Sequence, residues 1–597
     1  MNIGERFTTE EEIRRNFRRV GSLPKAGGPV IFSEGGNSYF DDGESHTMIV
    51  GRTGTGKSSC VSKAYVINCL NAGEDVIVFD PKGELFESTV CAAGKHDVHC
   101  LDYRTPRKSA DCYNPLLAPY QNYKSDDPEL NDMAEIQIDS MARNCIYPVI
   151  PATDPFWPSA SADYFMGLVY ALFELGSAEE INMASIFSMM SMSEIAIGGQ
   201  TLIRRLYESL PDSSPARRCL ATYIFAPNET RGSIHSVAAN GLAGFCRSKG
   251  LSEMLSNDTI NVNTVHLGDK PKAIYIIVPD ESSSYSVIVA TFISQIMQTY
   301  IYQAHEYYGG RLPNRLNLIF EEFATIGKCL PDMDNLAVAA RSRNIRIMMV
   351  LQNGAAQLEE LYGKSKTATI MSSIGITFTF SSNSWAALDE VSHFCGDKRM
   401  VTNNGFSSEP LISPVKIAAM PIGTALVTVN NRYKYVASLP FYNEIFNVPV
   451  CYKKWQRDSD VQREFAVFDM KKYVDEATRR LIASIASDDD FKSLFGSPLN
   501  ARESLLENID RRIAELEDME CEEENDNHEY EVVLDFITFS DSRLSEKLAE
   551  ITGKNAEEFD LHIEVKPYLF KFGTKAEAEE MVIKLMDIGA IARVVEC

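Results

Sequence analysis

The segment that most constrains the fold of this chain is residues 51–58, which read Gly-Arg-Thr-Gly-Thr-Gly-Lys-Ser and fit the pattern G-x-x-x-x-G-K-[ST] throughout. The apolar run HTMIV (46–50) precedes this segment, and the helix-forming stretch SCVSKAYVINCL (59–70) follows it. Glycines at these positions let the backbone bend between strand and helix, so that successive N–H groups face one phosphate group. The segment therefore predicts a phosphate-binding loop within an α/β sheet.

Nine consecutive residues of this loop are expected to contact a nucleotide. Lys57 would neutralise the charge of the β- and γ-phosphates, and Ser58 would ligate Mg²⁺. The alternative is a glycine-rich turn that carries Lys-Ser by chance, but such a turn needs no strand before it and no helix after it. The expected cofactors are ATP and Mg²⁺, and the expected contact residues are Gly51, Arg52, Thr53, Gly54, Thr55, Gly56, Lys57, Ser58 and Ser59.

Two consecutive glutamates follow the apolar run LNLIF (316–320). A nucleotide hydrolase needs one carboxylate beside the metal ion and another that polarises the attacking water. We assign Glu321 to Mg²⁺ and Glu322 to the water. The metal-side residue is more often Asp, so Glu321 departs from the usual pattern. The alternative is that the pair only ends a strand in solvent.

Polar residues also flank the apolar run RIMMVL (346–351). Gln352 comes directly after it, at the mouth of the same sheet, where it would sense the γ-phosphate or orient water. The segment AARSRNIR contains Arg341, Arg343 and Arg346, one of which would reach the γ-phosphate of a neighbouring subunit. A solvated basic turn is the alternative for this segment.

Short apolar runs rich in Val, Ile and Phe predict buried parallel strands with helices between them. These runs are HTMIV (46–50), DVIVFD (75–80), KAIYIIV (272–278), LNLIFEEF (316–323), RIMMVLQ (346–352), IGITFTF (374–380) and TALVTV (424–429). Residues 126–263 show helix-type spacing and no clear strand, so we predict an all-helical domain inserted in the sheet domain. The sheet domain then comprises residues 25–125 and 264–450, after an N-terminal segment of residues 1–24.

The C-terminal quarter of the chain is acidic. From Cys451 to Cys597 there are 20 basic and 35 acidic residues, which account for −15 of the net charge of −25. Within residues 451–528, SLLENIDRRIAELEDME predicts an amphipathic helix and EDMECEEENDNHE a solvated linker. Residues 529–597 predict a small α+β domain with strands at EVVLDFITFS, PYLFKFG and AIARVVE and helices at SRLSEKLAEIT and TKAEAEEMVIKLMDIG.

Composition excludes several classes of protein. The acidic balance argues against a broad basic surface for nucleic acid, although it leaves room for a local basic channel inside an oligomer. The 13 cysteines include no C-x-x-C pair, so neither a disulfide framework nor a zinc site is predicted, and a reducing cytosol is expected. No stretch approaches ~18 uninterrupted apolar residues, so we expect a soluble chain.

Five sequence blocks occur in a fixed order: HTMIVGRTGTGKSS, VIVFDPKGELFE, CYNPL, DPFW and FEEFATIGKCLPDMDNLAVAARSRNIRIMMVLQNGAAQLEELYG. Over residues 25–450 they resemble the TraG/TraD-type coupling-protein ATPases of conjugation and type IV secretion, relatives of the FtsK and HerA DNA pumps. The resemblance implies a RecA-like motor domain with an inserted all-α domain and a hexameric ring. It also implies ATP-driven passage of single-stranded DNA with its attached relaxase, or of effector proteins, to a secretion channel. By position, Arg341 resembles the trans-acting arginine of the family and Gln352 its sensor glutamine.

Two features depart from that family. Its members usually begin with transmembrane helices, which this sequence lacks, and they usually have Asp where this chain has Glu321. The resemblance therefore implies a protein of the bacterial cytoplasm, peripheral at the inner face of the cell membrane, where a secretion-channel or membrane-anchor protein tethers it in trans. The stretch KFGTKAEAEEMVIKLMDIGAIARVVE weakly resembles the C-terminal domain of the bacterial ribosomal stalk protein, and implies only a small docking module.

Two other functions compete with the motor. The first is a receptor that binds ATP to assemble but chiefly recruits substrate proteins, with the acidic C-terminal quarter as its docking surface. The second is a chromosomal DNA pump of the FtsK kind, which the blocks DPKGEL and RSRNI and the lack of an obvious winged-helix tail make less favourable. DNA-stimulated ATP hydrolysis separates the motor from the receptor.

Overall fold

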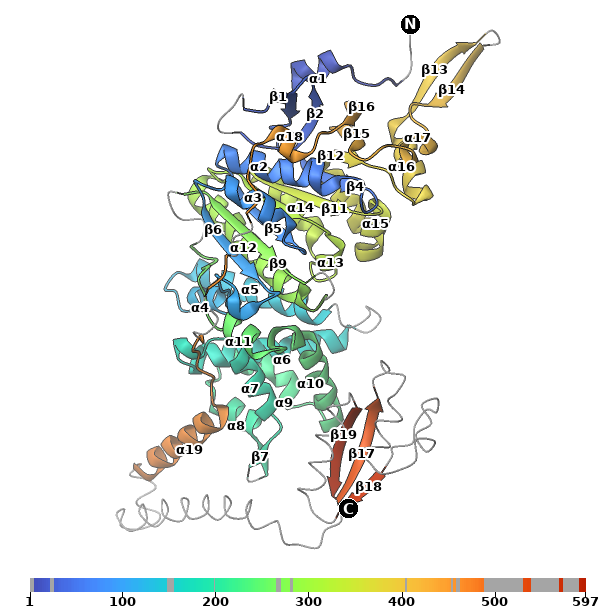
Figure 1. Ribbon diagram of the computed structural model, residues 1–597. Helices are drawn as coiled ribbons and strands as arrows, with labels where there is room; N and C mark the ends of the chain where they lie inside the picture. The colour runs from blue at the N-terminus through green and yellow to red at the C-terminus, as the bar shows by residue number, and fades with distance from the viewer. Residues whose placement is uncertain are drawn as a thin grey trace. The chain divides into compact units, whose positions relative to one another are not determined.

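The protein, seen in a computed structural model, divides into two compact units, Met1–Ala477 and Thr478–Cys597 (Figure 1). Within the described residues, none of the helices is long and apolar enough to span a membrane. The structure describes residues 5–21, 26–147, 155–197, 199–264, 270–279, 283–402, 405–451, 455–457, 462–487, 530–537, 569–572 and 590–596.

A large sheet forms the centre of the first unit. Its strands follow the order β16-β15-β12-β4-β11-β10-β5-β9-β6 in the described part of the chain. The seven strands from β12 to β6 pair in parallel, while β15 and β16 complete the sheet antiparallel. The bounds are β4 (His46–Val50), β5 (Asp75–Asp80), β6 (Asp97–Asp102), β9 (Lys272–Ile277), β10 (Leu316–Phe320), β11 (Ile345–Leu351), β12 (Ile374–Thr379), β15 (Thr424–Val429) and β16 (Tyr433–Ser438).

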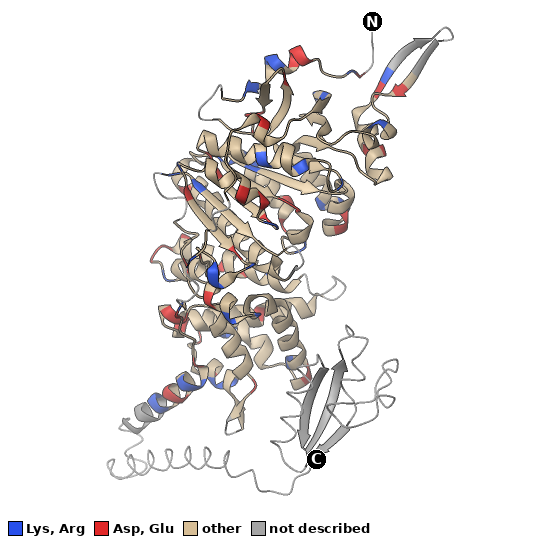
Figure 2. Cartoon of the chain, in the orientation of Figure 1, with Lys and Arg blue, Asp and Glu red and all other residues tan. Residues whose placement is uncertain are grey.

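Helices cover both faces of this sheet, which explains why its central strands are nearly continuous apolar runs. Alternate residues point to opposite faces: Val76 and Val78 belong to one apolar cluster, whereas Ile77 and Phe79 belong to the other. Helices α2 (Lys63–Ala72) and α3 (Glu84–Thr89) pack on the first face. The second face is covered by α12 (Ser286–Tyr308), α13 (Ala324–Gly327), α14 (Met333–Ser342) and α15 (Ala355–Ser373). Figure 2 draws the central strands mostly in tan, because few of their residues are charged.

The interval between β6 and β9 is helical, as its spacing predicts. Its two described strands, β7 (Ala196–Ile197) and β8 (Gln200–Thr201), form only a two-residue ladder. Its helices share one apolar core with the second face of the sheet. They are α4 (Leu117–Tyr123), α5 (Pro128–Ile146), α6 (Phe156–Leu175), α7 (Met183–Met192), α8 (Leu202–Ser209), α9 (Pro215–Ile224), α10 (Asn228–Leu242) and α11 (Lys249–Leu255).

Smaller elements surround the sheet. A capping box between Thr9 and Glu12 starts α1 (Glu10–Asn16), which is followed by a small sheet of β1 (Arg18–Arg19), β3 (Asn37–Phe40) and β2 (Val30–Glu34). Between β12 and β15 lie α16 (Trp385–Cys395), the hairpin of β13 (Asp397–Thr402) and β14 (Gly405–Pro410), and α17 (Pro414–Ala418). Short single turns are η1 (Lys57–Ser62), η2 (Val90–Ala92), η3 (Pro106–Lys108), η5 (Ala178–Glu180), η6 (Ala243–Cys246), η7 (Ser283–Tyr285) and α18 (Tyr442–Ile445).

The described residues between 446 and 474, here called the strap, connect the sheet to the helical insertion. At the sheet, the Cys451 amide donates to the Glu87 carbonyl at 2.7 Å, and the Trp455 ring meets the Phe86 ring edge-on at 6.5 Å. Further along, the Arg463 guanidinium donates to the Ser109 carbonyl at 2.7 Å. The strap therefore follows α3 and η3 toward the insertion.

At the insertion, the strap becomes part of the apolar core. The Phe468 amide donates to the Ser185 hydroxyl at 2.9 Å, and the side chains of Phe468, Met470 and Val474 are buried. The first turns of α19 (Met470–Ser487) thus pack with the insertion, and the first unit extends to Ala477. The domain border that the sequence predicts at residue 451 does not coincide with this end.

The second unit contains an antiparallel sheet in the order β18-β17-β19. Its strands β17 (Tyr530–Ile537), β18 (Leu569–Phe572) and β19 (Ala590–Glu596) coincide with EVVLDFITFS, PYLFKFG and AIARVVE, so the three predicted strands are confirmed. The predicted helices of this unit, the amphipathic helix after residue 503 and the acidic linker lie outside the described residues.

The sequence-based description of the large sheet needs two corrections. The run TALVTV forms β15, which pairs antiparallel with β12 and continues through a tight turn into β16, its antiparallel neighbour on the other side. Asn430 and Asn431 in that turn have φ of 49° and 55°, left-handed values that Asn adopts more readily than most residues with a side chain. Two strands were not predicted: β6 contains a His and two Asp, and β16 is interrupted by a Lys, so neither reads as an apolar run.

Candidate active site

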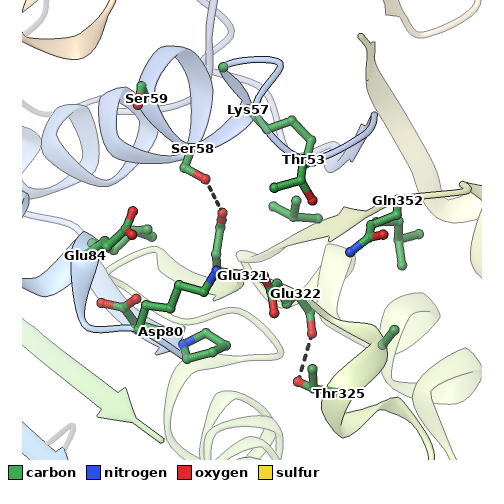
Figure 3. Close-up of a pocket in the computed structure, with 18 of the residues that line it drawn as sticks. Thr53, Lys57, Ser58, Ser59, Asp80, Glu84, Glu321, Glu322, Thr325 and Gln352 are labelled. Carbon is green, nitrogen blue, oxygen red and sulfur yellow. Dashed lines mark hydrogen bonds and ion pairs between the residues drawn. The ribbon is translucent and has the colours of Figure 1, made fainter. Parts of the chain in front are cut away.

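A cavity of about 500 Å³ opens at the carboxyl ends of β4, β5, β10 and β11. This edge of a parallel sheet is where ligands bind in open α/β folds. Figure 3 shows side chains from all of these elements pointing toward the same space. The lining residues are Thr53, Gly54, Gly56, Lys57, Ser58, Ser59, Asp80, Pro81, Lys82, Glu84, Leu85, Glu321, Glu322, Ala324, Thr325, Val350, Leu351, Gln352 and Gln357.

The glycine-rich loop adopts the bend that its sequence predicts. Gly54 and Gly56 have φ of 81° and 97°, values that residues with a side chain rarely adopt. The Lys57 ammonium lies across the loop and donates to the carbonyls of Gly51 at 2.6 Å and Arg52 at 3.0 Å. Burial lowers the pKa of Lys57, while Glu321 and Glu322 oppose that change. The amine is therefore already held where phosphate groups would lie.

Glu321 and Ser58 are brought together as the sequence predicts. The Ser58 hydroxyl donates to Glu321 Oε1 at 2.5 Å, and the Ser62 hydroxyl donates to Oε2 at 2.9 Å. Burial raises the pKa of Glu321, and these two hydroxyls and Lys57 counteract it. Ser62 was not singled out from the sequence, although its position one helical turn after Ser58 places both hydroxyls on one face.

Glu322 also lines the cavity, but in a different backbone conformation. Its φ is 56°, in the left-handed region that is strained for a residue with a side chain. The Thr325 hydroxyl donates to the Glu322 carbonyl at 2.9 Å, which supports this turn (Figure 3). The Glu322 carboxylate lies 3.7 Å from the Lys82 ammonium. The Glu322 side chain is 40% exposed, so it is open to solvent as well as to Lys82.

Gln352 reaches the cavity from the end of β11. The backbone N–H of Gln352 donates to the side-chain oxygen of Gln357 at 2.9 Å, and this hydrogen bond closes the turn after β11. The Gln352 side chain is exposed and lies with Lys57 and Glu322 around the same space (Figure 3). Its position is compatible with a contact to the terminal phosphate of a bound nucleotide.

The end of β5 contributes residues that sequence reasoning quoted only within a family block. Asp80 is 1% exposed, and its carboxylate accepts from the amides of Gly83 at 3.0 Å and Phe86 at 2.8 Å. Burial raises the pKa of Asp80 to about 7, which these amides oppose and Glu321 reinforces. Lys82 and Glu84 follow on the same turn and line the cavity. The signal in the sequence was that this turn directly follows DVIVFD, a predicted buried strand.

The three candidate arginines have different surroundings. Arg346 is 1% exposed, and its guanidinium lies 2.6 Å from Glu74 at the amino-terminal edge of the sheet. Arg343 donates to the Ala339 carbonyl at 2.9 Å. Arg341 is exposed in the last turn of α14, and the length of β11, at about 3.3 Å per residue, separates it from the cavity. None of the three approaches the cavity of its own chain.

The loop positions divide into two groups. Gly51, Arg52 and Thr55 are not among the residues that line the cavity, and they shape the loop instead: the Thr55 hydroxyl donates to the Arg52 carbonyl at 2.9 Å. The donor set that faces the cavity consists of hydroxyl and carboxylate oxygens. Mg²⁺ prefers oxygen ligands and usually keeps waters and phosphate oxygens in its shell, so Ser58 and Glu321 fit it. In the described residues, no cluster of three or more His, Cys, Asp or Glu could hold a metal ion alone.

Comparison with known proteins identifies similar molecules. A family model described as type IV secretory system conjugative DNA transfer matches residues 1–414. The fold is similar to the bacterial conjugative coupling protein TrwBdeltaN70 in an unbound form, with a TM-score of 0.54 over 76% of this chain and 95% of that chain, at 16% identity. The plasmid coupling protein TrwB in complex with ADP and Mg²⁺ gives a TM-score of 0.55 over 73% and 94%, also at 16% identity. No curated protein matches the sequence.

These similarities confirm the predicted fold class. The large sheet with its phosphate-binding loop is a RecA-like P-loop NTPase domain, and the helices between β6 and β9 are its all-α insertion.

Proposed function

This chain belongs to the type IV secretory system family of conjugative DNA transfer, and we propose that it is the ATP-hydrolysing coupling protein of a conjugative system. In this role it recruits a conjugative substrate, either single-stranded DNA with bound relaxase or an effector protein, and drives it to the secretion channel. The observation that carries the proposal is the convergence of Lys57, the Ser58–Glu321 pair and Glu322 on one cavity.

Each residue has a role that follows from its position. Without nucleotide, the Lys57 ammonium donates to two carbonyls of the loop. When nucleotide binds, it donates instead to oxygens of the β- and γ-phosphates. Ser58 and Glu321 would hold Mg²⁺, which would neutralise charge on the phosphate oxygens. Glu322 accepts a proton from the attacking water, and Gln352 orients that water. The plasmid coupling protein TrwB forms complexes with ADP and Mg²⁺ and with the ATP analogue ADPNP, which supports ATP and Mg²⁺ as cofactors here.

Two substitutions test the chemistry. Lys57→Ala removes the charge that binds phosphate, so nucleotide binding and hydrolysis should both fall. Glu322→Gln keeps the shape of the side chain but removes the base, so ATP should bind and persist without turnover. Hydrolysis is measured by phosphate release with and without single-stranded DNA. A Glu322→Gln protein that turns over ATP at the wild-type rate would exclude Glu322 as the base.

We further propose that the active site is completed between subunits of a homo-hexamer, with Arg341 as the trans-acting residue. Arg341 is exposed and lies far from the cavity of its own subunit, whereas the guanidinium of Arg346 is held in a buried ion pair with Glu74. An arginine supplied in trans contributes on the order of 10³–10⁵ in rate. Arg341→Ala should therefore abolish hydrolysis, and mixed rings with Lys57→Ala subunits should recover part of it. Full activity of a diluted monomer would contradict this arrangement.

The proposed setting is the inner face of the bacterial cell membrane, reached through a channel or anchor protein. A receptor without turnover is the second candidate, favoured by the −15 charge of the C-terminal quarter, which suits basic patches on relaxosome proteins. Since the strap packs into the first unit, the informative truncation is after Ser487 and not after residue 450. That truncation should leave hydrolysis near normal and reduce transfer in cells. Transfer at full efficiency would exclude a docking role for the removed part.

A further inference from the structure

Lys82 lines the cavity from the turn after β5, whereas the phosphate-binding loop follows β4. It belongs to neither of the motifs that assign the nucleotide site, yet its ammonium lies 3.7 Å from Glu322 Oε1. In the described residues, this is the one ion pair found for Glu322. The Lys82 side chain remains 44% exposed, so it can move without disturbing the core.

The backbone that presents Lys82 is held firmly. Asp80 accepts hydrogen bonds from the amides of Gly83 and Phe86, which fixes the turn between β5 and α3. The Arg104 guanidinium donates to the Lys82 carbonyl at 2.9 Å, and Asp102 holds that guanidinium through contacts of 3.0 and 2.9 Å. A rigid turn with one mobile cationic side chain is an arrangement that can deliver charge to a defined point.

The charges around the cavity indicate where Lys82 would act. Four carboxyl groups line it, from Asp80, Glu84, Glu321 and Glu322, and the cationic side chains of its lining are Lys57 and Lys82. Lys57 is held over the loop by two carbonyls, on the side of the β-phosphate. Lys82 lies beside Glu322, the residue proposed to contact the attacking water. A terminal phosphate would therefore lie between the two amines.

We propose that Lys82 distinguishes a nucleoside triphosphate from a diphosphate, an inference that rests on the proposed ATP hydrolysis. With no terminal phosphate present, Lys82 pairs with Glu322. When a triphosphate binds, the ammonium moves to the γ-phosphate, and the Glu322 carboxylate becomes free to accept a proton. The water oxygen then bonds to the γ-phosphorus, the bond from that phosphorus to the β–γ bridging oxygen breaks, and the water proton goes to Glu322.

The test compares the affinity for ADP with that for a non-hydrolysable ATP analogue, by titration calorimetry with Mg²⁺. Lys82→Met should lower the preference for the analogue at least about 10-fold, since hydrogen bonds to charged groups are of that strength, and leave ADP binding unchanged. Lys82→Arg should keep part of the preference. Lys95→Met, an exposed lysine away from the cavity, is the matched control and should change nothing.

A second variant makes the test specific to the pair. Glu322→Gln releases Lys82, so it should tighten the analogue up to about 5-fold, the range of an exposed ion pair, but only while Lys82 is present. The double variant Lys82→Met with Glu322→Gln should lose that gain. A structural role of Lys82 would not produce this dependence.

The outcomes separate the two proposals. Unchanged preference in Lys82→Met, with normal hydrolysis in the wild type, would overturn the role of Lys82 alone. An equal loss of ADP and analogue binding in Lys82→Met would also overturn it, because the side chain would then serve phosphate binding in general. A wild-type protein that binds neither nucleotide would overturn the proposed function itself.

Discussion

Two glutamates of the sheet domain are enclosed by protein under opposite electrostatic arrangements. Glu74 lies at the amino-terminal edge of the sheet, 2.6 Å from the guanidinium of Arg346 and 3.4 Å from that of Arg315. Glu321 lies at the carboxyl edge and accepts hydrogen bonds from the hydroxyls of Ser58 and Ser62, and it forms no ion pair with any residue that the structure describes. The pKa of Glu74 is lowered although burial opposes it, whereas burial raises the pKa of Glu321.

The difference lies in whether the charge is already neutralised. Glu74 also accepts from the Gly27 amide at 3.0 Å and from Asn317 at 2.9 Å, so no acceptor capacity is left for a ligand. Glu321 has only neutral donors and faces a cavity. A carboxylate that is held but not neutralised is prepared for a cation, which is what a metal ligand requires. The comparison therefore separates a buried charge that is neutralised within the protein from one that remains available to a ligand.

Glu74→Ala should give the largest effect, on stability. It would leave Arg346 buried with no anionic partner, and removing one member of a buried pair costs about 3–5 kcal/mol. Denaturant unfolding monitored by fluorescence measures the loss. Glu44→Ala is the control, because it breaks an exposed pair with Arg311 and should cost less than about 1 kcal/mol. Equal losses of unfolding free energy in Glu74→Ala and Glu44→Ala would contradict the structural role of the buried Glu74–Arg346 pair.

Glu321→Gln should give the next effect, on binding and not on stability. The amide keeps an oxygen that accepts from Ser58, so the free energy of unfolding should stay within about 0.5 kcal/mol of the wild type. Mg²⁺-dependent nucleotide affinity should fall about 10- to 100-fold, as for residues that support a metal. Titration with ADP at fixed Mg²⁺ and with excess chelator checks this. A large loss of stability in Glu321→Gln would show that Glu321, like Glu74, serves mainly to stabilise the fold.

The smallest effect is an opposite pH dependence. A lowered pKa in the folded state means that Glu74 stabilises the protein above its ordinary pKa and loses this contribution as the pH falls. A raised pKa means that Glu321 favours the folded state at low pH and loses that contribution as the pH rises. As the pH falls, the free energy of unfolding of the wild type should decrease relative to that of Glu74→Gln. Over the same range it should increase relative to that of Glu321→Gln.

Each slope is bounded by about 1.4 kcal/mol per pH unit, the limit for one proton. Unfolding curves on both sides of the ordinary glutamate pKa of about 4.3, from about pH 3 to pH 7, measure it for the three proteins. Slopes of the same sign in the two variants would contradict the comparison.

Sequence reasoning singled out Glu321, which we propose as a metal ligand, but not the structural Glu74. Glu321 follows an apolar strand and accompanies a phosphate-binding loop, so motif and order predict its surroundings. Glu74 has no such signal, because its partner Arg346 is 272 residues away and meets it only through the neighbouring positions of β5, β10 and β11. Because the sequence does not reveal this partner, we counted Arg346 among the three arginines that could reach a neighbouring subunit. The structure shows that its side chain is buried.

The order of the strands was equally out of reach from the sequence. Apolar runs predict that β5 and β10 exist, but each pairs with strands from distant parts of the chain through crossovers. Lys82 became visible only through this pairing, because its turn at the end of β5 faces Glu322 at the end of β10. Local chemistry is thus readable from the sequence, while the choice of neighbours depends on the packing of the whole sheet.

The strap also determines the order in which this protein is completed during synthesis. The amide of Phe468 bonds to Ser185, which precedes it by 283 residues, and Phe468, Met470 and Val474 fill the core of the helical insertion. Contacts between such distant residues form late, because the chain must close a long loop first. At roughly 5–20 residues per second, the insertion leaves the ribosome many seconds before these side chains do. Until then its apolar core stays open, and a nascent chain released early would expose that surface to its neighbours.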